Sequence, residues 1–272
     1  MDRYAVIGNP VAHSQSPRIH TMFARQTSQE LSYEAILAPP DGFARVVDDF
    51  RQAGGKGLNV TLPFKLDARN YVDECSQRAG RAGAVNTISF LADGTTQGDN
   101  TDGLGLLTDL TQNNDIVITA RDVLVLGAGG AVRGVLGPLI EAEPARLMIA
   151  NRTVSRAIHL QQDFADLSDI EACGFADLQN QRFDLIINGT SAGIKGQMPP
   201  IPETVLRPGG CCYDMFYARQ PTPFVQWGYQ HDAAKSLDGI GMLVEQAAES
   251  FLLWRGVRPK TQPVIEGLRA TK

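Results

Sequence analysis

Lys65 follows an apolar run that ends in a proline, within the stretch GLNVTLPFKLDA at residues 57–68. The run predicts a short strand, and Pro63 predicts a turn before a helix that begins near Lys65. A cation is disfavoured in the first turn of a helix, because the unpaired N–H groups there carry partial positive charge. A lysine in that position is therefore more consistent with chemistry than with a surface role, and we expect its amine to face a ligand.

Further polar side chains follow the ends of predicted strands in the first hundred residues. They are Ser14, Ser16, Thr61, Asn86, Asn100, Thr101 and Asp102. Open parallel sheets bind ligands beyond the carboxyl ends of their strands, and this mixture of hydroxyls, amides and a carboxylate suits a small polyhydroxylated molecule. A structural role fits two of them equally well: Ser16 as a helix N-cap with Pro17 at the first helical position, and Asp102 as a carboxylate at a helix start.

A glycine turn in DVLVLGAGGAVRG, residues 122–134, connects a predicted strand to a predicted helix. Gly127, Gly129 and Gly130 allow a tight turn and a close approach of the backbone to a pyrophosphate, which would lie at the helix N-terminus. The dinucleotide fingerprint is incomplete, because Val132 stands where its third glycine is expected. The strand–turn–helix context still favours a dinucleotide over a turn without a ligand.

The next predicted strand ends in NRTVSR, residues 151–156, which contains two arginines and no acid. NAD-binding folds usually place Asp or Glu here to accept hydrogen bonds from the ribose. Arg152 and Arg156 would instead pair with a 2′-phosphate. The stretch predicts NADP, against the alternatives of solvated arginines and of Thr153 as a helix N-cap.

Strands and helices alternate along most of the chain, which predicts two open α/β units, each with a mostly parallel sheet covered by helices. The pattern restarts near Thr101, and the second unit reads as a doubly wound sheet. Predicted strands cover residues 4–8, 33–38, 57–62, 85–92, 122–127, 146–151, 183–188 and 210–217. Predicted helices cover residues 16–26, 43–54, 100–112, 130–142, 239–256 and 263–270.

Bulk composition excludes several classes of protein. A net charge of −5, from 25 Lys and Arg against 30 Asp and Glu, gives no electrostatic case for nucleic acid. The N-terminal stretch MDRYAVIGNP has too short an apolar run for a signal peptide, and no run among the 272 residues is long enough for a membrane span. None of Cys75, Cys173, Cys211 and Cys212 forms a Cys-x-x-Cys pair, so we expect no metal site and buried free thiols in a reducing cytoplasm. His13 and His20 are interpreted as structural.

A set of motifs resembles the shikimate dehydrogenase family, in the family's order from residue 8 to about residue 256. They are GNPVAHSQSPRIH, NVTLPFK, AGAVNT, GDNTDG, LGAGGA, NRT, YDMFY and DGIGMLVEQAAESFLLWRG. The resemblance implies reversible NADPH-dependent reduction of 3-dehydroshikimate to shikimate in chorismate and aromatic amino-acid biosynthesis. It also implies a Rossmann-type second domain and a cleft between the two domains.

The resemblance assigns roles to particular residues. Lys65 and Asp102 would be the catalytic pair. The substrate would be bound by Ser14, Ser16, Thr61, Lys65, Asn86, Asp102, Tyr217 and Gln246. NADP would be bound by Gly127, Ala128, Gly129, Gly130, Ala131, Asn151, Arg152, Thr153, Arg156, Met215 and Gly239. No metal is implied.

The implied substrate domain covers residues 1–101 and 240–272, and the implied NADP domain covers 102–239. Two departures from the family pattern are Gly189 and Ala192, where relatives often carry Ala and Ser. Two other functions stay open: a quinate/shikimate dehydrogenase that also uses NAD, and a non-catalytic NADP-binding sensor. The implied protein is a cytoplasmic monomer or homodimer that acts on a small molecule.

Overall fold

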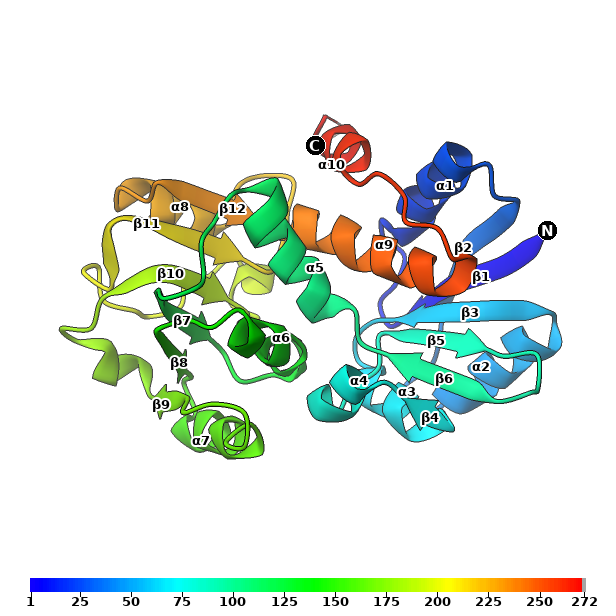
Figure 1. Ribbon diagram of the computed structural model, residues 1–272, viewed down its shortest axis with the longest axis horizontal. Coiled ribbons are helices and arrows are strands. Elements are labelled where there is room, and N and C mark those ends of the chain that lie inside the picture. The colour runs from blue at the N-terminus through cyan, green and yellow to red at the C-terminus, as the bar shows by residue number, and fades with distance from the viewer. Residues whose placement is uncertain (271–272) are drawn as a thin grey trace. The chain divides into compact units, whose positions relative to one another are not determined.

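The computed structural model describes residues 1–270 and divides into two compact units (Figure 1). Residues 1–105 and 243–267 form the first unit, and residues 106–242 with 268–270 belong to the second. The chain passes between the units inside α5 (Asp102–Thr108) and again inside α9 (Ile240–Arg255). The sequence predicts both boundaries a few residues earlier and assigns residues 268–270 to the first unit. The difference arises because the boundaries lie within continuous helices, where no loop residues mark them in the sequence.

The sheet of the first unit has six strands in the order β2-β1-β3-β5-β6-β4. Their bounds are β1 (Asp2–Gly8), β2 (Leu31–Leu37), β3 (Gly55–Val60), β4 (Glu74–Cys75), β5 (Thr87–Phe90) and β6 (Thr96–Asp99). β1 pairs in parallel with β2 and β3, and β4 pairs in parallel with β6, but β5 pairs antiparallel with both β3 and β6. The sheet is therefore mixed, with three parallel and two antiparallel strand pairs.

The antiparallel pairing of β5 with β6 arises from a hairpin that connects the two strands. The sequence predicts the turn at Asp93-Gly94 but no strand after it. In the structure the Gly94 N–H donates to the Leu91 carbonyl, and Asp93 accepts from the Thr95 backbone and hydroxyl. Antiparallel strands need only such a short connection, whereas parallel strands need a crossover.

Helices of the first unit pack on this sheet through helical repeats of apolar residues. They are α1 (Ser16–Thr27), α2 (Phe43–Gln52), α3 (Lys65–Tyr71), α4 (Gln77–Ala82), α9 from Leu243 onward, and α10 (Gln262–Arg269) as far as Gly267, where the chain crosses a third boundary. In α2, Phe43, Val47 and Phe50 recur at the spacing of one helix face, and all three are buried in one hydrophobic cluster with Leu58 and Ile88.

His20 lies in an aromatic cluster of the first unit, where it stacks on Tyr33 with 4.1 Å between ring centroids and contacts Phe251 and Trp254. Its side chain is 1% exposed, and neither ring nitrogen has a hydrogen-bond partner among the described residues. Burial lowers the pKa of His20 from 6.5 to about 3, so the ring is neutral at neutral pH. His20 is a core residue, as the sequence predicts.

The sheet of the second unit has six parallel strands in the order β12-β11-β10-β7-β8-β9. Their bounds are β7 (Asp122–Leu126), β8 (Arg146–Ala150), β9 (Glu171–Cys173), β10 (Phe183–Asn188), β11 (Leu206–Asp214) and β12 (Lys235–Asp238). β7, the first strand of this unit, lies between β8 and β10 (Figure 1). The strand order reverses there, which is the switch point where doubly wound sheets bind ligands.

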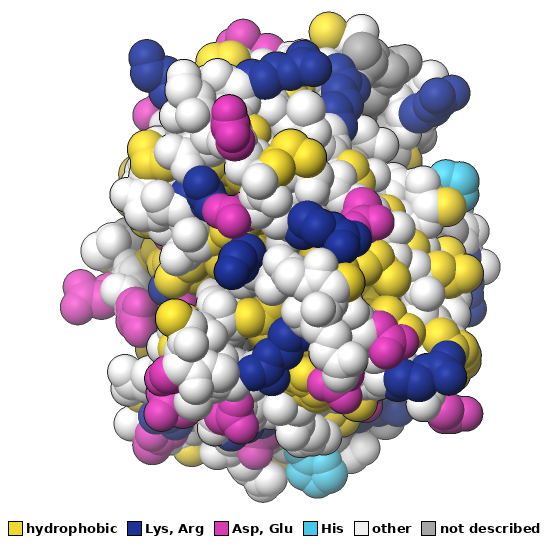
Figure 2. Space-filling view, turned by 90° about the vertical axis from the view of Figure 1, so that its right-hand side faces the viewer, with side chains coloured by type: hydrophobic (Ala, Val, Ile, Leu, Met, Phe, Trp, Pro, Cys, Tyr) yellow, Lys and Arg dark blue, Asp and Glu magenta, His cyan; other side chains and the backbone are white. Residues whose placement is uncertain are grey.

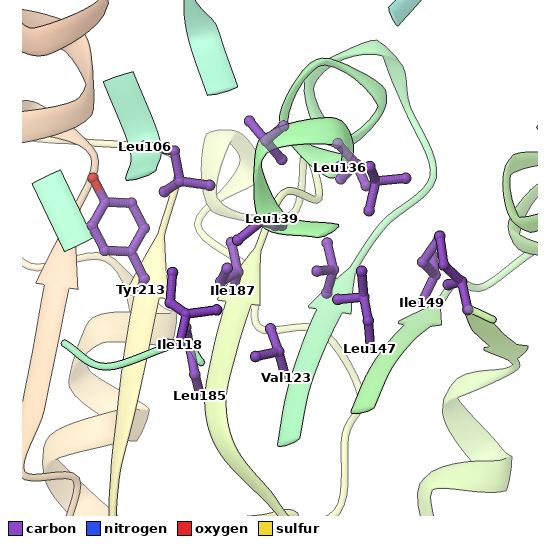
Figure 3. Packing of buried hydrophobic residues seen from close by; sticks show 14 of the residues in the cluster. Leu106, Ile118, Val123, Leu136, Leu139, Leu147, Ile149, Leu185, Ile187 and Tyr213 are labelled. Atoms are coloured by element: carbon purple, nitrogen blue, oxygen red, sulfur yellow. The ribbon is translucent and has the colours of Figure 1, made fainter. Parts of the chain in front are cut away.

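Both faces of the second sheet are buried. Alternate strand residues such as Val123, Leu147 and Ile187 belong to one hydrophobic cluster, and their neighbours belong to another. Leu136 and Leu139 lie above the strands of the first cluster (Figure 3). The helical elements of this unit are α6 (Gly130–Glu141), α7 (Val154–Asp163), α8 (Pro223–Gln230), the short 3₁₀ turns η2 (Phe175–Leu178) and η3 (Gly193–Lys195), and the π-helix η1 (Asp109–Asn113).

Asp109 is a buried carboxylate at the start of η1, where the sequence predicts an uninterrupted α-helix. It is 1% exposed and accepts a hydrogen bond from the Tyr213 hydroxyl at 2.6 Å, and the Met242 N–H donates to the same hydroxyl. Burial raises the pKa of Asp109, and the Tyr213 hydrogen bond opposes this shift. The cluster joins η1, β11 and the first turn of α9 within the second unit.

The four cysteines are not all buried, although the sequence predicts buried free thiols. Cys212 is buried and the other three free thiols are partly exposed. Cys75 and Cys173 are the last residues of the edge strands β4 and β9, whereas Cys211 lies within β11. Within residues 1–270 no helix has the length and apolar character to cross a membrane, and no cluster of His, Cys, Asp or Glu could hold a metal ion. On the face shown in Figure 2, Lys and Arg side chains are interspersed with Asp and Glu.

We expect His20 to make the protein sensitive to acid. A folded-state pKa of about 3 lies below the ordinary value of 6.5, so the unfolded chain binds a proton first. The contribution of His20 to stability is complete above pH 6.5 and is lost as pH falls toward 3, by up to about 1.4 kcal/mol per pH unit. His20→Phe should lose less stability than the wild type between about pH 7 and pH 4.5, measured by urea denaturation. His159→Gln, at an exposed position of α7, is the control, and identical pH dependence in the wild type and His20→Phe would contradict this account.

Candidate active site

Lys65 is fixed at the carboxyl end of β3 by its backbone and its neighbour. Phe64 is 1% exposed and stacks on Phe43, and the carbonyl of Lys65 accepts a hydrogen bond from the Val85 N–H at 2.9 Å. Lys65 is the first residue of α3, as the sequence predicts. The buried neighbour and the backbone bond therefore fix the backbone position from which the lysine side chain extends.

Asp102 is held at the end of β6 by a cluster of polar contacts. Asp99 accepts two hydrogen bonds from Arg78, at 2.6 and 2.7 Å, and a third from Ser76. Asn100 donates to the Ala84 carbonyl, and its side-chain oxygen accepts from the Asp102 N–H. Asp102 then begins α5 as a buried residue, where the helix N-terminus favours a negative charge.

Lys65 and Asp102 form an ion pair between Nζ and Oδ2. The other carboxylate oxygen, Oδ1, accepts a hydrogen bond from Asn86 Nδ2 at 2.7 Å. The lysine side chain is 21% exposed and that of Asp102 10%, so an amine and a carboxylate are paired at a site with limited access to water. The arrangement can donate a proton to a ligand oxygen, or accept one from it, at Nζ.

The other residues predicted for the substrate lie in the same unit, apart from Tyr217. The Gln246 oxygen is 3.5 Å from both Asn86 Nδ2 and Thr101 Oγ1. Thr61 directly follows β3, and its N–H donates to Ile7 of the adjacent β1. Ser14 and Ser16 lie beyond the end of β1, where the Ser16 N–H donates to the Ser14 hydroxyl at 3.3 Å.

The structure separates two of the structural alternatives. Ser16 is not an N-cap, because it is already the first residue of α1 and the N-cap is Gln15. Thr153 does occupy the N-cap position of α7, but its side chain makes no capping hydrogen bond. Neither hydroxyl is needed to cap its helix.

The glycine turn lies at the end of β7, beside the switch point of the second sheet. Gly127 has φ +107°, a conformation that L side chains rarely adopt, and its N–H donates to the Ala150 carbonyl of β8. Gly129, Gly130 and Ala131 are exposed at the N-terminus of α6, and a Cβ atom at either glycine would meet open space. The backbone N–H groups of this turn are therefore accessible to an anion.

The NRTVSR stretch connects β8 to α7, next to the glycine turn. Arg152, Thr153 and Arg156 are exposed, and Asn151 donates to the Thr153 carbonyl at 2.9 Å. The Arg156 N–H donates to the Thr153 carbonyl, but within residues 1–270 neither the Arg152 nor the Arg156 guanidinium group has a hydrogen-bond or ion-pair partner. Two unpaired guanidinium groups at this edge of the sheet fit a phosphate group on the ribose of a dinucleotide.

Met215 and Tyr217 follow β11, and Gly239 follows the neighbouring β12. A Cβ atom at Gly239 would lie 2.3 Å from the Met215 carbonyl oxygen, so the two strand ends are in close contact. Burial raises the pKa of Asp214, the last residue of β11, to about 6, while hydrogen bonds from Thr222, the Phe216 N–H and Asn188 oppose the shift. Asp214 thereby anchors the turn that carries Met215.

Several polar residues of the site region have no recognisable signal in the sequence. In the first unit they are Asn59, Thr87 and Ser250, which hydrogen-bond one another beneath Asn86. In the second unit they are Asn188 and Asp214. Each of these residues lies in a strand or helix whose pattern is otherwise apolar. The only signal that could have revealed them is a polar residue at a position that the pattern predicts to be buried.

Comparison with known proteins gives consistent matches along the chain. Residues 6–88 match the shikimate dehydrogenase substrate binding domain, 109–195 the shikimate/quinate 5-dehydrogenase family, and 239–269 the shikimate 5'-dehydrogenase C-terminal domain. A shikimate dehydrogenase (NADP(+)) of Methylococcus capsulatus is 57% identical over 271 residues, which cover 100% of this chain and 97% of the relative. The chain belongs to the shikimate dehydrogenase family. The shikimate dehydrogenase (NADP(+)) of Alkalilimnicola ehrlichii is also 57% identical, over 98% of each chain.

Solved structures agree with this assignment to the shikimate dehydrogenase family. An Ael1 enzyme from Pseudomonas putida matches with a TM-score of 0.92 and 44% identity over 98% of each chain. The shikimate 5-dehydrogenase of Thermus thermophilus, in complex with NADP(H) and shikimate, matches with a TM-score of 0.89 and 32% identity over the full length of both chains. The predicted Rossmann-type α/β fold is thereby confirmed.

Val132 and Gly189 fit each other in space. Val132 stands at the position of the third glycine of the dinucleotide fingerprint, and Gly189 is one of the two positions predicted from the sequence to depart from the family pattern. A Cβ atom at Gly189 would lie 2.4 Å from Val132 Cγ2 and 3.1 Å from Met215 Sδ. The third fingerprint glycine normally allows close packing of helix and strand, and here the space is provided by Gly189 instead.

Gly189→Ala should therefore reduce the free energy of unfolding by about 1–3 kcal/mol, as overpacked cores do. Val132→Ala in the same chain should recover part of this loss, because the methyl group that clashes is removed. Urea denaturation of the wild type, both single variants and the double variant measures the coupling, expected at about 0.5–3 kcal/mol. Additive effects of the two substitutions would show that the residues do not share this space.

Proposed function

We propose that the protein catalyses the NADP-dependent, reversible reduction of 3-dehydroshikimate to shikimate. The observation that carries the proposal is the Lys65–Asp102 ion pair with Asn86 on the second carboxylate oxygen, in a chain of the shikimate dehydrogenase family. Its relatives at 49–57% identity are named as NADP(+) enzymes. The reaction serves chorismate and aromatic amino-acid biosynthesis.

Reduction of a ketone leaves negative charge on the carbonyl oxygen, and a positioned proton donor accelerates such steps by about 10²–10⁴-fold. NADPH, when bound, supplies the hydride. The Lys65 ammonium stabilises the developing charge and donates its proton to the oxygen. In the oxidation of shikimate the Lys65 amine takes the hydroxyl proton. Asp102 holds Nζ in place and accepts a hydrogen bond from a ring hydroxyl.

The residues of the second unit fit NADP rather than NAD. Arg152 and Arg156 are exposed cations without partners among residues 1–270, and neither Asn151 nor Thr153 adds the acid that an NAD site would need. Gly127–Ala131 bind the pyrophosphate, and Met215 and Gly239 flank the nicotinamide. This assigns residues 102–239 to the cofactor.

The remaining roles follow the residues of the first unit. Ser14 and Ser16, with Tyr217, bind the substrate carboxylate. Thr61, Asn86, Asp102 and Gln246 bind the ring hydroxyls. Residues 1–101 and 240–272 form the substrate domain, and Asp102 directly follows its first segment. We place the enzyme in the cytoplasm as a monomer or homodimer.

Absorbance at 340 nm with shikimate and NADP tests the activity directly. We expect strong turnover with this pair and little with NAD or with quinate. Comparable rates with NAD or quinate would replace the proposal by a broader quinate/shikimate dehydrogenase. No turnover with any pair, together with quenching of protein fluorescence by NADPH, would indicate a non-catalytic sensor.

Within the same assay, the double variant Arg152→Gln/Arg156→Gln should reduce the preference for NADP over NAD by about tenfold or more, because charge-assisted hydrogen bonds contribute about 1.5–3 kcal/mol. Arg121→Gln is the control, since Arg121 is exposed before the start of β7, at the opposite edge of the sheet. An unchanged preference in the double variant would remove the arginines from the 2′-phosphate site.

A further inference from the structure

The side-chain amide of Asn86 has one orientation, which its partners determine. On one side the Thr101 N–H donates to Oδ1 at 2.9 Å, and on the other Nδ2 donates to Asp102 Oδ1 at 2.7 Å. A backbone N–H can only donate, and a carboxylate can only accept. Rotating the amide by 180° would turn Nδ2 toward the Thr101 N–H, so that two donors face each other. It would also turn Oδ1 toward the Asp102 carboxylate, so that two acceptors face each other.

Thr87 contributes a second donor to the oxygen side of this amide. Its hydroxyl donates to Asn86 Oδ1 at 2.8 Å, and the Thr87 side chain is 1% exposed. The same hydroxyl accepts from Asn59 Nδ2 at 3.2 Å and lies 2.8 Å from Ser250 Oγ. Because the Asn86 amide oxygen can only accept, its contact with Thr87 requires the Thr87 proton, whereas Ser250 can be the donor in its own contact with Thr87.

Asn59 and Ser250 hold Thr87 from two other elements of the first unit. Asn59 Nδ2 donates to Ser250 Oγ at 2.9 Å, and Asn59 Oδ1 accepts from the Tyr33 hydroxyl at 2.7 Å. Ser250 lies on α9 and also hydrogen-bonds the Gln246 carbonyl at 3.1 Å. Asn59, Thr87 and Ser250 are all buried, and a buried polar network whose members are satisfied is rigid.

We propose that Thr87 is a positioning residue for proton transfer at Lys65, because its hydroxyl fixes the Asn86 amide in the orientation that hydrogen-bonds and orients the Asp102 carboxylate. The proposal rests on the proposed function of Lys65 and Asp102. Thr87 itself touches neither of these residues and acts through Asn86.

Loss of the Thr87 hydroxyl would have two consequences. Asn86 Oδ1 would retain only its contacts with Thr101, and Asn59 would lose one acceptor for a buried N–H. The Asn86 amide would then have greater freedom, and the Asp102 carboxylate would no longer be held in one position against Lys65. Misplacement of a catalytic group by about 1 Å can cost about 10²-fold in rate.

The test compares Thr87→Val, which removes the hydroxyl while keeping the shape, with Thr87→Ser, which keeps the hydroxyl. We expect Thr87→Val to lower kcat for shikimate oxidation by about 10-fold to 10²-fold, and Thr87→Ser to restore most of this loss. In ¹H–¹⁵N spectra the side-chain amide signals of Asn86 should shift or broaden in Thr87→Val and stay near their wild-type positions in Thr87→Ser. If Thr87→Val does not fold, Thr87→Ala takes its place.

Thr96→Val is the matched control. Thr96 is 2% exposed on the adjacent strand β6, and its hydroxyl is bonded to Asp73, away from Lys65. It should lose stability but keep the wild-type kcat and Asn86 signals. Wild-type kcat and unchanged Asn86 signals in Thr87→Val would overturn the proposal, as would equal losses in Thr87→Val and Thr87→Ser. If the wild type itself shows no turnover, the proposed function fails, and the Asn86 signals alone decide the role of Thr87.

Discussion

The organisation of the first unit depends on the ion pair between Lys65 and Asp102. Two opposite charges that are largely removed from water stabilise each other only in good geometry, and the loss of one partner leaves the other uncompensated. The surroundings meet this requirement from both sides. The buried Phe64 and the Lys65–Val85 backbone bond fix the lysine, while the bidentate Arg78–Asp99 pair fixes the segment that leads into Asp102.

The second unit offers an anion a binding site that is built partly from backbone N–H groups. Its parallel sheet brings the glycine turn after β7 beside the end of β8, so that accessible N–H groups and the guanidinium groups of Arg152 and Arg156 lie at one edge. Neither arginine is paired among the described residues, which leaves both available to an anionic ligand. The first unit thus provides acid–base chemistry, and the second provides the features of a phosphate-binding site.

Local signals in the sequence predicted much of this arrangement. The strand, glycine turn and helix at 122–141 were recognisable because each part has its own composition, and Lys65 was recognisable because a cation is unusual at a helix start. The short strands β4, β6, β9 and β12 were missed, because two to four residues are too few to show a period. The antiparallel direction of β5 was also missed, because the sequence of one strand does not indicate which strands it pairs with.

The network beneath Asn86 lay beyond prediction for a similar reason. Asn59 and Ser250 are 191 residues apart in the chain, and Thr87 and Ser250 are 163 apart. Each looks like an ordinary strand or helix residue until the fold brings them together. Residue types with local meaning were therefore predictable, whereas hydrogen bonds across distant elements required the structure.

A double-mutant cycle on kcat tests the central claim that Lys65 and Asp102 act as one unit. Lys65→Met and Asp102→Asn remove the two charges and keep similar shapes. The account predicts that each single variant lowers kcat by about 10²–10⁴-fold, and that the double variant is little worse than the more damaged single variant, because residues that act together are not additive. Independent, multiplicative losses would contradict a coupled pair, and an unchanged kcat with a raised KM in Lys65→Met would make the lysine a binding residue instead.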